Sequence, residues 1–285
     1  MNEHAICTRP VVAVPGHEPS LLPASKNWKL VWNDEFDGTE LDRTKWSFRL
    51  NFWGRRFPAY TDEGVVLDGK SNVEIHLIEH DGQYSSAQLQ TGSNSFDPPV
   101  ANEPNPWGQQ DIWPLASIQK PTFMHRYGYY ECRCKFQRSD GWWSAFWLQS
   151  PSIGTSYNPA YSGIECDIME CFRAGIREVT TGNIYGGYGK DFRENGRITY
   201  TCDETPDGFH RFGVDWSSEG YVFYCDGRET ARTEGPVSRV EQFILLTTEP
   251  KGYRLKHPAP VPELRATVLP DCFTVDYVRV FDRDQ

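Results

Sequence analysis

The stretch Gly163-Ile164-Glu165-Cys166-Asp167-Ile168-Met169-Glu170-Cys171-Phe172 places three acids among apolar residues. Side chains alternate between the two faces of a β-strand, so Glu165 and Asp167 share one face. Strict alternation would send Glu170 to the opposite, apolar face. One extra residue, a β-bulge at Ile168-Met169, would return Glu170 to the face of the other two acids. The sequence therefore predicts a bulged strand with three carboxylates in a row.

Three like charges on one strand face do not stabilise a fold, because carboxylates at short range repel each other. Catalysis does gain from such a row. One carboxylate can stay ionised as a nucleophile while another keeps its proton and acts as an acid. The alternative is an exposed strand face that is acidic for no catalytic reason, or a cation site. The spacing of the acids alone leaves both interpretations open.

Short alternating segments recur along the rest of the chain and predict about a dozen strands. Turn dipeptides such as Asp68-Gly69, Asp81-Gly82 and Asp226-Gly227 separate them. Such a pattern, without a long helix, is typical of an all-β fold. We expect an antiparallel two-sheet β-sandwich, a jelly roll, with a concave substrate cleft.

Residues 1–26 contain four prolines and lack periodicity, which predicts an extended N-terminal arm. Residues 27–285 are then the β-jelly-roll catalytic domain. Residues 93–121 hold six prolines with Trp107 and Trp113, and a loop of this length is often functional.

The composition and net charge disfavour several classes of partner. The 285 residues carry a formal net charge of -10, which disfavours nucleic acid and anionic membranes as partners. No run of about 18 apolar residues predicts a transmembrane helix. Residues 1–16 have no apolar core of the signal-peptide kind, so no signal peptide is visible.

The eight cysteines form no CxxC pair, which disfavours a zinc site. They are better interpreted as small buried hydrophobic residues. A disulfide between Cys202 and Cys225 is compatible with the sequence but cannot be derived from it.

The chain resembles glycoside hydrolase family 16, the group of laminarinases, lichenases, agarases and carrageenases. The hallmark of that family is Glu-x-Asp-x-x-Glu on a bulged strand, matched here by Glu165, Asp167 and Glu170. Further matches occur in the family's order along residues 28–281. They include Val31–Gly38, Tyr127–Glu131, Trp143–Leu148, Phe209–Gly227 and Val275–Val280.

The resemblance implies hydrolysis with retention of anomeric configuration. Glu165 would be the nucleophile, and Glu170 would protonate the leaving oxygen and then deprotonate the incoming water. Retaining enzymes place these two carboxyls roughly 5–5.5 Å apart. Asp167 would couple to the pair and keep the two pKa values separated. No cofactor is implied for catalysis.

The resemblance also implies sugar-binding residues. Trp143 and Trp147 match cleft tryptophans that stack on pyranose rings, with core packing as the alternative. Asn51 and Arg55 align with a loop that contacts sugars on the non-reducing side, although this loop departs from the glucanase type. Many members carry a histidine on the strand after the acids. Here Asn183 or Tyr185 would take its place, or the local subsite differs from theirs.

Family members often bind a structural calcium ion on the convex side. By match, its ligands would be Glu35, Gly69 and Asp276, mostly through backbone oxygens of the kind that suits Ca²⁺. The alternative is that Asp276 is an ordinary exposed strand residue.

The expected activity is that of a retaining endo-β-glycosidase on a β-1,3-glucan of the laminarin type. Tyr60-Thr61, the Trp-x-Ala-x-Trp pattern and Asp167–Glu170 resemble that branch of the family. A red-algal galactan such as agarose, porphyran or carrageenan is the alternative substrate, and its sulfate groups would meet arginines. These arginines are Arg55, Arg56, Arg173, Arg177, Arg193 and Arg197. A catalytically inactive lectin on the same fold is less favoured, because all three acids are present.

The expected partner is thus a polysaccharide, with no nucleic acid and no membrane, and the protein is expected to be a monomer. A polymer substrate predicts an extracellular or cell-envelope location.

Overall fold

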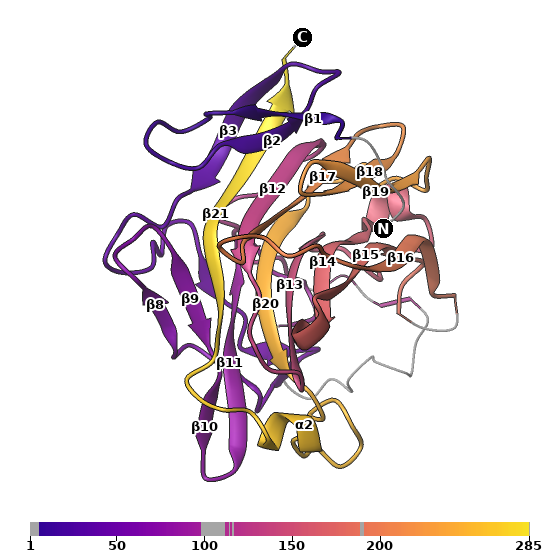
Figure 1. The fold of residues 1–285 in the computed structure, drawn as a ribbon. Helices are drawn as coiled ribbons and strands as arrows, with labels where there is room; N and C mark the ends of the chain where they lie inside the picture. Colours follow the sequence, from indigo (N-terminus) through magenta and orange to yellow (C-terminus); the bar gives the residue numbers. More distant parts are fainter. Residues whose placement is uncertain (1–5, 98–111, 114, 116, 189–190, 285) are drawn as a thin grey trace.

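The computed structural model describes residues 6–97, 112–113, 115, 117–188 and 191–284. Within these residues two large sheets pack face to face, and their strands are almost all antiparallel (Figure 1). This confirms the expected all-β sandwich. Trp107 and most of the long proline-rich loop fall outside the described residues.

The first sheet carries the acidic strand. In the described part of the chain it has nine strands, in the order β10-β11-β20-β13-β14-β15-β16, with β4 and β7 also paired to β11. Their bounds are β4 (Ser47–Phe48), β7 (Tyr60–Thr61), β10 (Ile78–His80), β11 (Gln83–Gln90), β13 (Trp142–Gln149), β14 (Glu165–Arg173), β15 (Glu178–Tyr185), β16 (Arg193–Thr201) and β20 (Phe243–Pro250).

The second sheet covers the opposite side of the core. Among the described residues it has eight strands, in the order β19-β18-β17-β12-β21-β9-β8, with β3 also paired to β21. Their bounds are β3 (Trp28–Asp34), β8 (Val65–Leu67), β9 (Val73–His76), β12 (Gly128–Lys135), β17 (His210–Trp216), β18 (Tyr221–Cys225), β19 (Arg228–Thr233) and β21 (Cys272–Arg283).

Smaller elements complete the described chain. Two short hairpins, β1 (Thr8–Val11) with β2 (Ser20–Pro23) and β5 (Asn51–Phe52) with β6 (Arg55–Arg56), lie beside the sheets. The α-helices of the described residues are the single turns α1 (Pro159–Ser162) and α2 (Pro262–Arg265), and Ala174–Ile176 forms a 3-10 turn. Among the described residues, no helix is long and apolar enough to cross a membrane.

The core lies between the two sheets and explains which segments became strands. Phe243–Pro250, which begins with four apolar residues, is buried at every position, as expected for a central strand. Inward-facing residues of both sheets, such as Phe146, Ile168, Phe212 and Val278, meet in one cluster with 0–1% of their surface exposed. Burial of apolar surface on this scale supplies the main driving force for folding.

The described part of the N-terminal arm contains a β-hairpin. Residues 8–23 form the β1–β2 hairpin, and Leu22 packs with Tyr129, Tyr224 and Phe281 on the second sheet. The backbone amide of Leu21 also donates to the buried carboxylate of Glu131 over 2.7 Å. The start of the chain is therefore attached to the second sheet, and the domain boundary at residues 26–27 stays a prediction.

Candidate active site

The predicted bulge in β14 is confirmed. Across β13, Trp147 pairs with Asp167 and Phe146 pairs with Met169, so Ile168 is the extra residue. The pairing with β15 shifts in the same place, between Asp167 and Glu170. As a result Ile168 and Met169 both enter the core, and Glu170 returns to the face of the other acids.

The three acids line one cleft on the outer face of the first sheet. The cleft has a volume of about 220 Å³. Its walls carry Trp143 and Trp147 from β13, Ile184 from β15, and Trp53 and Tyr188 from loops. Acids and aromatic rings therefore face the same space, as a sugar-binding cleft requires.

Glu165 is held by two donors. Gln149 Nε2 donates to Glu165 Oε2 over 3.0 Å, and the Tyr188 hydroxyl donates to the same oxygen. Burial, followed by the charge of Glu165, raises the pKa of Tyr188 well above its usual value. Tyr188 therefore keeps its proton and stays a donor, so both contacts orient the carboxylate.

Arg197 joins the other two acids. Its guanidinium donates to Asp167 Oδ2 over 2.9 Å and to Glu170 Oε2 over 2.8 Å. Gly182 permits this approach, because a Cβ there would lie 2.5 Å from Arg197 Cα. Arg197 was expected only as a possible sulfate contact, and the structure pairs it with the acids instead.

The carboxyl groups have different proton affinities. Burial raises the pKa of Asp167 well above its usual value, and the charges of Glu170 and Glu165 add to this effect. Burial also raises the pKa of Glu170 to about 7, against the lowering effect of Arg197 and with a further increase from Glu165. Near neutral pH a proton is therefore available at Glu170 for transfer to a leaving group.

Trp143 and Trp147 both lie in the cleft and are only partly buried. The Trp147 indole donates to Thr247 Oγ1 over 2.9 Å, and Trp143 stacks on Phe172 with the ring centroids 5.5 Å apart. These contacts fix the two rings on the cleft wall. Their role in sugar stacking stays a prediction.

Three other expected sugar contacts do not line the cleft. Tyr185 packs against the core, because Ile184 pairs with Glu165 and takes the cleft face of β15. Asn51 and Arg55 lie in the β5–β6 hairpin, from which Phe52 and Trp53 reach the cleft instead. The other candidate, Asn183, is buried opposite Cys166 on the core side.

Two ion pairs at the cleft, which involve Arg49 and Arg254, were not found from the sequence. Buried Arg49 donates to Asp97 over 2.6 Å, and Arg254 makes two contacts of 2.6 Å with Glu249. The Tyr60 hydroxyl also donates to Glu249 over 2.8 Å. No sequence motif marks these residues. Arg49 and Asp97 lie far apart in the chain, and the segment from Glu249 to Arg254 matches no recognisable pattern.

The residues expected to bind calcium have other partners. Arg133 donates to the Asp276 carboxylate over 2.5 Å, and Arg279 makes contacts of 2.9 and 2.6 Å with Glu35. A calcium ion beside these carboxylates would lie next to two guanidinium groups, so the side chains do not fit it. Calcium binding at these residues stays a prediction, and the two ion pairs argue against it.

Comparison with known proteins agrees with this arrangement. Residues 111–244 match the family described as Glycosyl hydrolases family 16. Over 280 residues the chain is 26% identical to the glucan endo-1,3-beta-glucosidase A1 of Niallia circulans, covering 91% of this chain and 38% of that protein. It is also 24% identical over 208 residues to the keratan-sulfate endo-1,4-beta-galactosidase of Sphingobacterium multivorum, covering 71% of this chain and 42% of that protein.

The fold has solved counterparts. It is similar to the catalytic domain of an endo-1,3-beta-glucanase (laminarinase) from Thermotoga petrophila RKU-1, with a TM-score of 0.65 and 22% identity. That likeness covers 91% of this chain and 100% of the other. The chain spans less than half of the length of the two curated relatives named above. In its matched segment, its sandwich and its bulged acidic strand, this chain is similar to members of glycosyl hydrolases family 16.

Proposed function

We propose that this protein is a retaining endo-β-glycosidase that cleaves a β-1,3-glucan of the laminarin type. The observation that carries the proposal is the bulged strand β14, which presents Glu165, Asp167 and Glu170 to one cleft. Relatives named as glucan endo-1,3-beta-glucosidases support the choice of substrate. A polymer substrate places the action outside the cell or in its envelope.

The chemistry follows from the surroundings of each acid. Glu165 attacks the anomeric carbon, with its carboxylate oriented by Gln149 and Tyr188. Glu170, whose pKa is raised to about 7 chiefly by burial, protonates the leaving oxygen. Once the glycosyl–enzyme ester has formed, ionised Glu170 accepts a proton from water, which hydrolyses the ester with overall retention.

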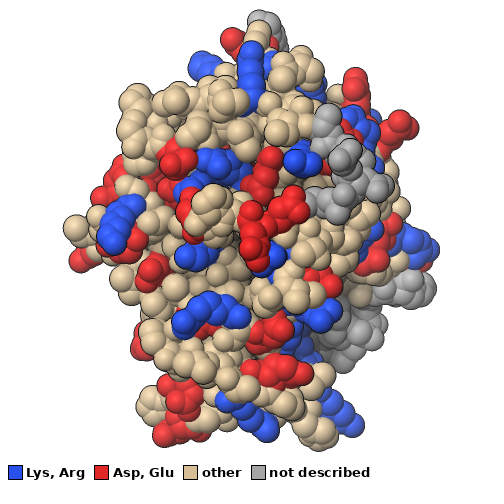
Figure 2. All heavy atoms as spheres, viewed as in Figure 1, with Lys and Arg blue, Asp and Glu red and all other residues tan. Residues whose placement is uncertain are grey.

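Charges in the cleft favour a neutral substrate. The described arginines that line it, Arg49 and Arg254, are each paired with a carboxylate at 2.6 Å. Arg197 is likewise bound to Asp167 and Glu170. A sulfate group would have to compete with these carboxylates for the guanidinium groups. On the face drawn in Figure 2, acidic and basic side chains of the described residues are interspersed, without one large basic patch.

A galactan is the second candidate, favoured by the similarity to a protein named as a keratan-sulfate endo-1,4-beta-galactosidase. The deciding experiment is a product-resolved assay on laminarin, lichenan, agarose, porphyran and carrageenan. We expect oligosaccharides of several lengths from laminarin, with the new reducing ends first appearing as β-anomers by NMR. Hydrolysis of a galactan but of no glucan would overturn the substrate, and first-formed α-anomers would overturn the mechanism. Glucan binding without any product would indicate a lectin.

Arg197 is expected to set the alkaline limit of activity. Its positive charge lowers the pKa of Glu170, so Arg197→Met should raise that pKa. Because catalysis needs protonated Glu170, the alkaline limb of kcat/KM should move to higher pH. Arg197→Lys keeps a charge and should move the limb less.

The matched control is Arg193→Met, four residues earlier on the same strand and more than half exposed. It should leave the alkaline limb unchanged. An unshifted limb in Arg197→Met, with hydrolysis still measurable, would show that Arg197 does not act on the acid.

A further inference from the structure

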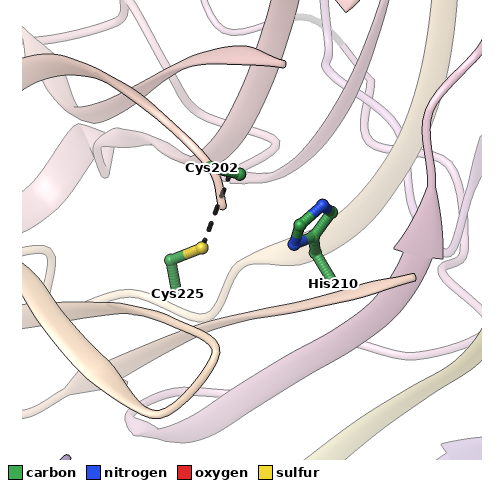
Figure 3. Close-up of side chains that lie close together, drawn as sticks. All are labelled: Cys202, His210 and Cys225. Carbon is green, nitrogen blue, oxygen red and sulfur yellow. Dashed lines mark hydrogen bonds between the residues drawn. The ribbon is translucent and has the colours of Figure 1, made fainter. Parts of the chain in front are cut away.

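A second group of reactive side chains lies away from the cleft, at one edge of the sandwich. Cys202 follows β16 of the first sheet, whereas His210 begins β17 and Cys225 ends β18 of the second sheet. One ligand atom from each lies within 4.8 Å of the others (Figure 3). All three residues are buried, with 1–3% of their surface exposed. None of them lines the cleft.

The spacing of the two thiols matches that of metal ligands. Cys202 Sγ and Cys225 Sγ are 3.7 Å apart (Figure 3). Two thiolates at about 2.3 Å from a tetrahedral zinc ion lie about 3.8 Å apart. A disulfide would need the sulfur atoms to approach to about 2.05 Å. The pair can therefore accept a metal ion with almost no movement of the sulfur atoms.

The imidazole is held in place beside the thiols. His210 stacks on Phe136 with the ring centroids 5.6 Å apart, and its Nδ1 lies 2.7 Å from Asp226 Oδ2. The same Asp226 oxygen lies 3.8 Å from Cys225 Sγ. Asp226 can thus complete a tetrahedral set as the fourth ligand, or hold the imidazole that binds the metal.

We propose that Cys202, His210 and Cys225, together with Asp226, form a structural zinc site that joins the two sheets. Two thiolates, one neutral imidazole and one carboxylate are ligands that zinc prefers. Binding replaces the two thiol protons with one Zn²⁺ and releases both protons to solvent. The site is distinct from the cleft and does not depend on the proposed glycosidase activity.

A search for CxxC motifs misses this site, because Cys202, His210 and Cys225 are separated by 8 and 15 residues in the chain. They meet through tertiary structure. Strand pairing places Cys225 opposite Phe212, and β16 contacts β19 at the edge where the two sheets approach each other.

The test uses the full chain, purified under reducing conditions without chelator. We expect one equivalent of zinc per chain by elemental analysis. After removal of the zinc, one equivalent of Co²⁺ should give the visible bands of tetrahedral cobalt and a near-ultraviolet thiolate-to-cobalt band. Cys225→Ser should lose that thiolate band and the tightly bound equivalent. Cys7→Ser, which changes an exposed thiol outside the group, should keep both.

Measurements on the wild-type protein alone can overturn the proposal, so the test does not depend on whether a variant folds. Reduced, folded wild-type chain that takes up no Co²⁺ with a thiolate band would show that there is no such site. A Cys202–Cys225 disulfide in the protein purified without added reductant, found by peptide mass spectrometry, would assign the pair to a covalent cross-link instead. Neither measurement depends on the hydrolysis of laminarin.

Discussion

Glu165→Gln is expected to lower kcat/KM on laminarin by about a thousandfold or more, which is a loss of at least ~4 kcal/mol of transition-state stabilisation. The amide keeps the size of the side chain but cannot attack the anomeric carbon. Gln149 and Tyr188 stay in place, so the fold and the affinity for glucan should change little. The measurements are initial rates by reducing-sugar release and glucan binding by calorimetry.

The assignment of Glu165 can be tested by rescue. Glu165→Ala opens a space into which azide can diffuse and attack an activated aryl β-glucoside from the side that Glu165 occupied. The product should be the α-glycosyl azide. Glu178→Gln, which changes a partly exposed acid paired with Arg173 on the neighbouring strand, serves as the control and should retain activity. Laminarin hydrolysis at the wild-type rate in Glu165→Gln would remove Glu165 from the mechanism.

Glu170→Gln is expected to lower turnover of laminarin by roughly 10²–10⁴-fold, the usual contribution of a positioned acid or base. An aryl glucoside with a good leaving group needs no proton, so the first step should survive in this variant. The second step should then be slow, because no base at position 170 activates water. A burst of phenol close to the enzyme concentration should precede the slow steady rate.

The pH profile gives an independent test of Glu170. Its pKa is raised to about 7, mainly by burial, so kcat/KM of the wild-type protein should fall as the pH rises through that value. The alkaline limb should be absent for the burst step of Glu170→Gln. Azide should give the β-glycosyl azide here, the opposite anomer to the Glu165→Ala product. The same anomer from both variants would refute the division of roles.

The sequence predicts the sandwich and the bulged strand because both follow from local patterns. Alternation marks the strands, and the out-of-phase Glu170 can only be reconciled with Glu165 and Asp167 by an extra residue. The register between strands is not local. Whether Ile184 or Tyr185 of β15 faces the cleft depends on its pairing with Glu165, and the sequence contains no signal for that pairing.

The sequence also does not reveal the hydrogen-bond partners of the acids, because the pairing between strands is not a local property. Tyr188 lies 23 residues from Glu165, and Arg197 lies 27 residues from Glu170. Both reach the acids only because β15 pairs with β14, and β16 in turn pairs with β15. Among the arginines, the expected Arg55 is exposed on a hairpin, while Arg49 takes a buried place beside Trp147. The geometry of short loops, which the sequence does not predict, decides which of these side chains reach the cleft.

The bulge in β14 has a consequence for how this protein can change. Glu165 and Glu170 belong to one continuous strand between two paired neighbours, so their separation is an internal property of the backbone. Much of the cleft wall comes from elsewhere, including the β5–β6 hairpin and the segment around Tyr188. Exchanging those segments between homologues should alter which polymer fits while the stereochemistry of the product is inherited unchanged. Substrate choice and reaction type can therefore evolve, or be engineered, as separate traits of one chain.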